Sequence, residues 1–148
     1  MMYESRDIEN KKIRVVIDTG VWISFFIGKV LKKLGHYIKK ENIIFLFSDE
    51  LFDEIIEVLN RPTIKKYIKE DQVYEILGII KYKAEWIKIK ERTDICGDKK
   101  DNFLLDLSYN GDADYLITGD DGLLVIEHFK GTKIINFREF DEIFSRPR

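Results

Sequence analysis

The sequence predicts an α/β fold of three layers, with helices on both faces of a central parallel sheet of about five strands. Three observations favour this fold. Short runs rich in β-branched and other apolar residues alternate with longer segments of helical periodicity. The connections between these runs are long enough to hold a helix, as parallel pairing requires. The chain has 148 residues, the size of one ordinary domain.

The first half of the chain contains two continuous apolar runs that predict buried strands. Ser48 follows the second run and can cap the next helix, which has to end before Pro62. Apolar residues recur at helical spacing in the longer segments. We expect strands at 13–18 and 43–47, helices at 21–40, 49–60 and 71–83, and a helical turn at 64–68.

The second half begins with an alternating segment, EWIKIK, that is typical of a strand near a sheet edge. A polar loop over 91–100 follows it, and Gly111 ends the next helix. We expect strands at 85–90, 114–118 and 133–136, and helices at 101–110, 120–128 and 137–144.

The domain organisation predicted from these elements is simple. Residues 13–144 form a single domain, 1–12 a flexible N-terminal segment and 145–148 a C-terminal tail. The polar N-terminus lacks the apolar core of a signal peptide, and no apolar run reaches the roughly 18 residues of a membrane helix. A single cysteine, Cys96, favours a reducing compartment, so we expect a cytoplasmic protein that does not contact a membrane.

Charge and composition exclude several classes of protein. The 25 Lys and Arg residues nearly balance the 27 Asp and Glu residues, leaving a net charge of −2, which argues against nucleic-acid binding by bulk charge. Cys96, His36 and His128 are too few for a Cys/His zinc site. Neither a GxGxxG nor a GxxxxGK[ST] phosphate-binding loop is present.

Acidic residues follow the predicted strands. Asp18 closes the first strand, Asp101 lies at the start of a helix after the third, and Asp120 follows the fourth. The helix after the second strand carries an acidic stripe that includes Glu54. Because ligand sites of parallel sheets lie beyond the carboxyl ends of the strands, we expect these acids to share one edge.

A group of carboxylates is electrostatically unfavourable unless a cation neutralises it. Hard oxygen ligands select Mg²⁺ or Mn²⁺, and one or two such ions can activate water and neutralise a phosphodiester during attack. The acids therefore predict metal-assisted hydrolysis of a phosphate ester. Asp18, Asp101 and Asp120 also suit helix caps, and the stripe around Glu54 suits a solvated face, so a purely structural role stays open for each.

Three segments resemble PIN-domain proteins of the toxin–antitoxin type, related to the VapC-like ribonucleases. They are VVIDTGVWIS (15–24), SDELFDEIIEVLNRP (48–62) and DKKDNFLLDLSYNGDADYLITGDDGLL (98–124). The resemblance covers most of residues 13–140 and implies a PIN-like strand order of 3-2-1-4-5.

The same resemblance implies a function and a set of site residues. It implies a Mg²⁺- or Mn²⁺-dependent endoribonuclease, the toxin of a toxin–antitoxin pair, inhibited by a small antitoxin protein. It assigns Asp18, Glu54, Asp101 and Asp120 as metal ligands and catalytic residues, with Thr118 supporting the last turn. Gly20 stands where the family usually has Asn, so a catalytically weak or inactive PIN-like module that binds RNA or a protein partner is the alternative.

Partner surfaces are less sharply indicated. Lys99 and Lys100 lie beside the acids and are the candidates for RNA contact, with lysines at 32, 33, 39 and 40 as others. Solubility accounts for these lysines equally well. Trp22, Phe25 and Phe26 make the first helix apolar nearly all round, which favours a homodimer.

Overall fold

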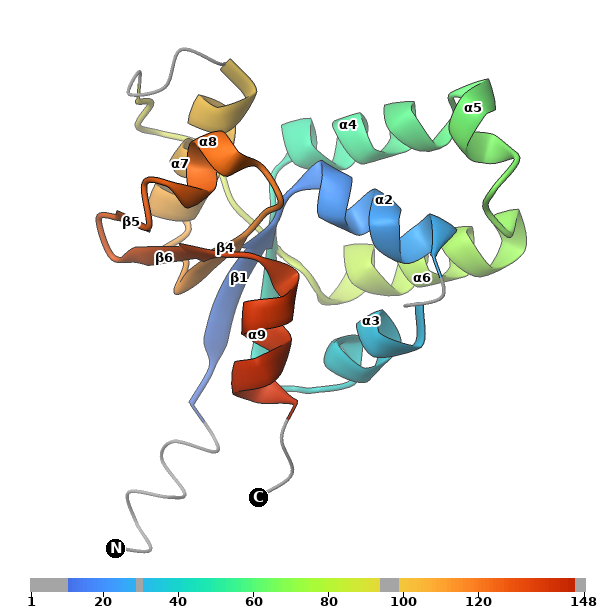
Figure 1. The fold of residues 1–148 in the computed structure, drawn as a ribbon, viewed down its shortest axis with the longest axis horizontal. Coiled ribbons are helices and arrows are strands. Elements are labelled where there is room, and N and C mark those ends of the chain that lie inside the picture. The colour runs from blue at the N-terminus through green and yellow to red at the C-terminus, as the bar shows by residue number, and fades with distance from the viewer. Residues whose placement is uncertain (1–10, 29–30, 94–98, 146–148) are drawn as a thin grey trace, which may run out of the picture.

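The computed structural model describes residues 11–28, 31–93 and 99–145 (Figure 1). Cys96 and the loop residue Asp98 lie outside these ranges. The strands are β1 (Ile13–Ile17), β2 (Ile43–Phe47), β3 (Glu85–Trp86), β4 (Tyr115–Ile117), β5 (His128–Phe129) and β6 (Thr132–Ile135). The helices are α2 (Thr19–Ile27), α3 (Leu31–Ile38), α4 (Asp49–Leu59), α5 (Pro62–Lys65), α6 (Glu70–Lys83), α7 (Lys99–Asn110), α8 (Asp121–Leu124) and α9 (Phe137–Phe144).

The six strands form one sheet in the order β3-β2-β1-β4-β6-β5. All pairings are parallel except that of β5 with β6. Val15 of the central strand pairs with Phe45 of β2 and with Tyr115 of β4. The fifth predicted strand, at 133–136, is the observed β6. The predicted α/β class and the predicted order 3-2-1-4-5 are therefore confirmed, and β5 is an additional strand at the edge.

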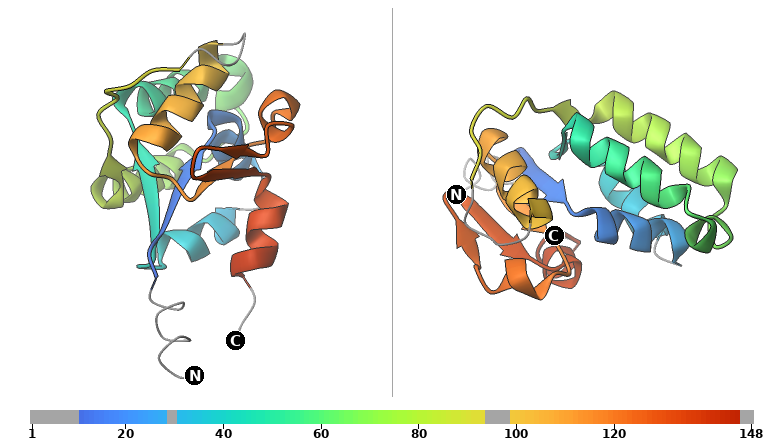
Figure 2. Two further views of the ribbon diagram at one scale, coloured as in Figure 1. Left: turned by 90° about the vertical axis from the view of Figure 1, so that its left-hand side faces the viewer. Right: turned by 90° about the horizontal axis from the view of Figure 1, so that it is seen from above.

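Helices cover both faces of the sheet. Helix α7 packs against β1, β2 and β4 on one face. In the two views of Figure 2, α2, α3, α4 and α6 lie on the other side of the sheet. The arrangement leaves the carboxyl ends of β1 and β4 side by side at one edge, between the start of α2 and the start of α8.

The first helix, α2, is anchored in an aromatic core. Trp22 is 1% exposed, and its ring lies 5.4–6.2 Å from those of Phe25, Phe26, Phe45 and Phe47. The expectation that Trp22, Phe25 and Phe26 present a surface for a second copy is wrong. The three side chains are buried because the sheet and neighbouring elements enclose all but a narrow stripe of α2.

The helical turn predicted over 64–68 begins two residues earlier, as α5 (Pro62–Lys65). Three other predicted elements differ more strongly from those observed. The helix predicted over 21–40 is two helices, because Gly28 is extended and ends α2. The strand predicted over 85–90 pairs only at Glu85–Trp86, since beyond Trp86 the described chain runs without regular structure. The helix predicted over 120–128 ends at Leu124, where the chain turns into the β5–β6 hairpin through left-handed Glu127 and Lys130.

A polar contact ties α3 to α9. The Tyr37 hydroxyl donates to Asp141 Oδ1 at 2.6 Å, and Lys33 Nζ lies 3.1 Å from Asp141 Oδ2. Burial alone raises the pKa of Asp141, but the bonds from Tyr37 and Lys33 outweigh it and leave that pKa below its ordinary value. Among the described residues, no helix is both long and apolar enough to cross a membrane.

Candidate active site

Two aspartates lie at the carboxyl ends of adjacent strands. Asp18 follows β1 and caps α2, accepting a hydrogen bond from the Gly20 N–H at Oδ1 (3.4 Å). Asp120 lies beyond β4 and caps α8, accepting from the Gly122 N–H at Oδ1 (2.9 Å). Each cap uses one carboxylate oxygen and fixes the orientation of the group. Capping and ligand binding are therefore compatible roles for both residues.

A single hydroxyl group joins the two aspartates. Thr118 is fully buried, and its Oγ1 donates to Asp18 Oδ2 at 2.7 Å. The same oxygen accepts from the backbone N–H of Asp120 at 3.0 Å. The Thr118 N–H is itself bonded to the Ile135 carbonyl of β6. The hydroxyl therefore sets the position of both strand ends relative to each other.

The third aspartate approaches from α7. Asp101 lies in the first turn of that helix and is 9% exposed. A Cβ placed on Gly122 would lie 3.3 Å from Asp120 Oδ1 and 3.5 Å from Asp101 Oδ2. The two carboxylates thus face the same point above the Gly122 backbone, and glycine keeps that point clear.

Glu54 lies on α4, at the margin of this group. Its side chain is 24% exposed, and Oε1 lies 3.6 Å from Lys100 Nζ at the start of α7. On the same helix, Glu50 is paired with Arg92 at 3.5 Å. Lys100 therefore brings Glu54 towards the helix that carries Asp101, while Lys99 is exposed beside it.

The donor chemistry suits a hard divalent cation. The Asp18 carboxylate is tied through the Thr118 hydroxyl to the backbone N–H of Asp120, and the Asp120 carboxylate faces that of Asp101 across Gly122. Within residues 11–28, 31–93 and 99–145, no three or more His, Cys, Asp or Glu side chains converge closely enough to hold a metal. Anionic oxygens supplied by three elements at one sheet edge are the ligands that Mg²⁺ and Mn²⁺ prefer.

Two residues of the turns bear on the alternatives left open by the sequence. Asp120 does cap α8, because its carboxylate reaches the Gly122 N–H. A Cβ at Gly20 would meet nothing within 4 Å, so the position where the family usually has Asn has room for a side chain.

Two further residues of the site region escaped sequence reasoning. Gly122 leaves room between Asp120 and Asp101 because it has no side chain. The periodicity of apolar residues gives no information on such a position. Asp106 on α7 is 4% exposed, and its Oδ1 accepts from the Thr93 N–H at 2.6 Å. Burial raises the pKa of Asp106 despite that bond. A buried acid on the inner face of a helix was the available signal.

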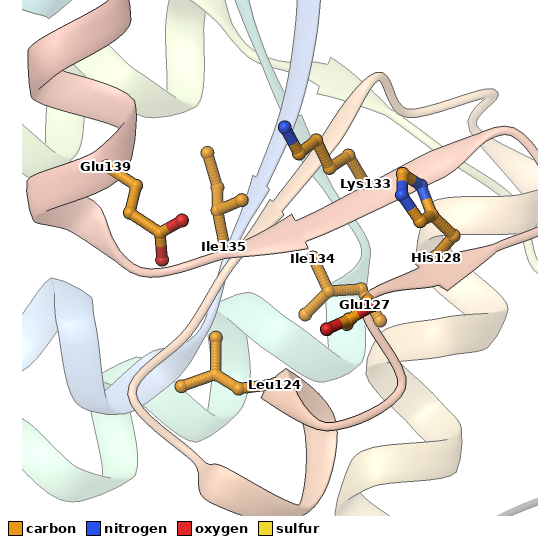
Figure 3. A pocket seen from close by; sticks show the side chains of 7 residues that line it. All are labelled: Leu124, Glu127, His128, Lys133, Ile134, Ile135 and Glu139. Carbon is orange, nitrogen blue, oxygen red and sulfur yellow. The ribbon is translucent and has the colours of Figure 1, made fainter.

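A separate pocket of about 290 Å³ lies between α8, the β5–β6 hairpin and α9 (Figure 3). Its polar lining mixes Glu127, His128, Lys133 and Glu139. Figure 3 shows Glu139 standing apart from Glu127 and His128. The mixed charges do not form a set of like ligands, so the strand-end aspartates are the better candidate site.

Two comparisons with known proteins agree with this fold. A family model described as a PIN domain matches residues 14–122. The chain is also 30% identical over 150 residues to the uncharacterized protein MJ1680 of Methanocaldococcus jannaschii, an alignment that covers 94% of this chain and 96% of that protein. The match to the family model includes β1, β2 and β4, with Asp18, Glu54, Asp101 and Asp120. The chain belongs to the PIN domain family, whose members are generally nucleases.

Proposed function

We propose that this protein is a Mg²⁺- or Mn²⁺-dependent ribonuclease that hydrolyses phosphodiester bonds of RNA. Asp18, Glu54, Asp101 and Asp120 are the proposed ligands of one or two ions. The observation that carries the proposal is the link from Asp18 through the Thr118 hydroxyl to Asp120, with Asp101 facing Asp120 across Gly122. No feature of the fold favours the alternative of an inactive binding module.

The chain's own residues contribute position and charge. A bound divalent ion supplies Lewis-acid polarisation of the phosphate and lowers the pKa of water near it. Asp18 and Asp120 are oriented in advance because the N–H groups of Gly20 and Gly122 hold one oxygen of each. Thr118 ties the Asp18 carboxylate to the backbone N–H of Asp120, so little reorganisation is needed when substrate arrives. The proposed hydrolysis is direct, without a covalent bond to the enzyme.

Glu54 and Lys100 form an ion pair at the edge of the site that can separate when a ligand binds. Lys100 lies 3.6 Å from Glu54 in the structure and is largely exposed. An exposed pair of this kind is worth little energy, so it can open at low cost when a ligand approaches. In this proposal Glu54 turns towards the cation and Lys100, with Lys99, turns towards an RNA phosphate.

Cleavage of single-stranded RNA tests the proposal. We expect the wild-type protein to cleave RNA with Mg²⁺ or Mn²⁺ and to lose this activity when EDTA is added. Asp120→Asn removes the charge but keeps the capping oxygen, so the fold should survive while cleavage falls by about 100-fold or more. Asp121→Asn, on the exposed neighbour, is the matched control. Equal cleavage by wild type and Asp120→Asn would rule out the proposed site.

The resemblance to VapC-like ribonucleases supports a more specific biological role. We propose the toxin of a toxin–antitoxin pair, with a small antitoxin protein and a second copy of the chain as partners. Expression of the wild type in a bacterial host should arrest growth, and Asp120→Asn should not. Co-expression of a small protein encoded beside this chain's gene should relieve the arrest. Unimpaired growth with an active nuclease would contradict the toxin role.

A further inference from the structure

A groove of about 470 Å³ lies at the end of α2 remote from the acids, where α2 meets the start of α6. Phe26 and Val73 are its buried lining residues. Its exposed lining includes Lys32, Tyr67 and Lys69. We call this site the α2–α6 groove.

The α2–α6 groove is electropositive. Lys32 and Lys69 line it, and neither forms a salt bridge with a carboxylate among the described residues. Among the described residues, no acidic side chain lines it. Two acids follow Lys69 in the sequence: Glu70 is paired with Lys65 at 3.5 Å, and Asp71 does not line the groove. The groove therefore suits an anionic ligand.

Tyr67 gives the groove an aromatic surface. Its side chain is 63% exposed, although a tyrosine ring is largely apolar. Lys66 Nζ lies 5.2 Å from the ring centroid, a distance typical of a cation–π contact. An exposed aromatic ring among unpaired lysines is the arrangement that binds single-stranded nucleic acid, in which the bases stack and the phosphates bind cations.

An uncharged stripe connects the groove with the acids. Helix α2 begins beside Asp18 and runs to the groove, a distance of about 14 Å for nine residues. Its exposed residues are Gly20, Ser24, Ile27 and Gly28, all without charge. Figure 1 shows α2 leading from the sheet edge towards α5 and α6. A polyanion that lies along this stripe meets no carboxylate of α2 beyond Asp18.

We propose that the α2–α6 groove holds a single-stranded RNA segment continuous with the strand at the acids, which rests on the proposed ribonuclease function. A base stacks on Tyr67, and Lys32 and Lys69 bind flanking phosphates. The groove thereby anchors the substrate a few nucleotides from the scissile bond and raises affinity without taking part in the chemistry.

Binding of a short fluorescein-labelled oligouridylate, measured by anisotropy in EDTA, tests the groove without cleavage. Tyr67→Ala should weaken binding by about tenfold, and Tyr67→Phe should bind like wild type, because the ring rather than the hydroxyl stacks. The double variant Lys32→Ala/Lys69→Ala should reduce the slope of log K against log salt by about 1.4.

The matched control uses a second exposed tyrosine, Tyr82, which lies on α6. Tyr82 is 90% exposed beside Lys81 and Lys83 but does not line the groove. Tyr82→Ala should leave binding unchanged, and so should Lys88→Ala, which removes an exposed lysine that does not line the groove. Equal losses of affinity for Tyr82→Ala and Tyr67→Ala would overturn the proposal. Displacement of the labelled RNA by polyglutamate as effectively as by unlabelled oligouridylate would overturn it too.

Cleavage assays separate this proposal from the proposed function. With Mg²⁺, Tyr67→Ala should raise KM about tenfold and leave kcat unchanged. If Asp120→Asn abolishes cleavage while Tyr67→Ala has a wild-type KM, the groove proposal fails and the ribonuclease stands. If the wild type cleaves no RNA but Tyr67→Ala still weakens oligouridylate binding, the ribonuclease proposal fails and the groove stands.

Discussion

At the residue scale, Thr118 is the connection on which the geometry of the candidate site depends. Its hydroxyl donates to Asp18 and accepts from the Asp120 N–H, and it has no access to water. Replacing a buried hydroxyl that both donates and accepts a hydrogen bond lowers the free energy of unfolding, because both partners lose a hydrogen bond. Both the stability of the fold and the geometry of the candidate site therefore depend on Thr118.

Two substitutions of Thr118 distinguish the effect of its hydroxyl group from that of its size and shape. Thr118→Val should lower the free energy of unfolding by about 1–3 kcal/mol, because the Asp120 N–H is left without its partner. It should also slow RNA cleavage by about 10- to 100-fold. Thr118→Ser keeps the hydroxyl and should preserve most of the activity. Urea denaturation and single-turnover cleavage measure the two effects, and full activity in Thr118→Val would contradict them.

Gly122 tests the point at which Asp101 and Asp120 face each other. In Gly122→Ala the new Cβ would lie 3.3 Å from Asp120 Oδ1. Cleavage should fall by about tenfold or more, whereas thermal stability should change by less than about 1 kcal/mol because alanine favours the helix. Gly119→Ala is the control, since its Cβ would meet nothing within 4 Å. A fully active Gly122→Ala would show that this point is not used.

The sequence predicted the strand-end acids because parallel strands bring their carboxyl ends to one edge. Glu54 is different: periodicity leaves it equivalent to Glu50 and Glu57, and only the family resemblance selects it. The structure adds that Glu54 contacts Lys100 whereas Glu50 contacts Arg92. Such contacts between residues far apart in the sequence depend on how α4, α7 and the chain before α7 pack together. A local sequence pattern does not predict this packing.

At the element scale, two of the three misjudged elements end at turns. Gly28 ends α2 by adopting an extended conformation, yet the apolar periodicity continues into α3 and conceals the break. Glu127 and Lys130 adopt left-handed conformations at the β5–β6 hairpin, and neither residue type favours that region. Elements with strong caps were predicted well: α9 runs from Phe137 to Phe144 behind the Asn136–Glu139 capping box.

The contact between α3 and α9 has a pH signature. Because the pKa of Asp141 is lower in the folded protein than its ordinary value, this group stabilises the fold above about pH 4, and the stabilisation is lost as pH falls through the folded pKa. Tyr37→Phe should cost about 1 kcal/mol at neutral pH and less at about pH 3.

Denaturation of Tyr37→Phe and wild type at both pH values measures this difference. Tyr74→Phe is the control, because Tyr74 also lies on a helix but is 43% exposed, and its hydroxyl forms no hydrogen bond with another described residue. A penalty for Tyr37→Phe that is the same at both pH values would contradict the assigned role of the Asp141 carboxylate.

At the scale of the whole molecule, the net charge of −2 conceals two opposed regions. Asp18, Asp101 and Asp120 gather at the sheet edge, while unpaired Lys32 and Lys69 lie at the far end of α2. A polyanion is therefore repelled at the acids unless a cation is present and attracted at the groove. In the proposed function, a cation held by Asp18, Asp101 and Asp120 would make the two regions compatible with one RNA strand.

Calorimetric titration with Mn²⁺ tests the central claim that the strand-end acids form a metal centre. The account predicts saturable binding to the wild type, at least about tenfold weaker binding to Asp18→Asn, and unchanged binding to Asp71→Asn at the start of α6. Absence of Mn²⁺ binding by the folded wild type, or equal affinity of wild type and Asp18→Asn, would contradict it.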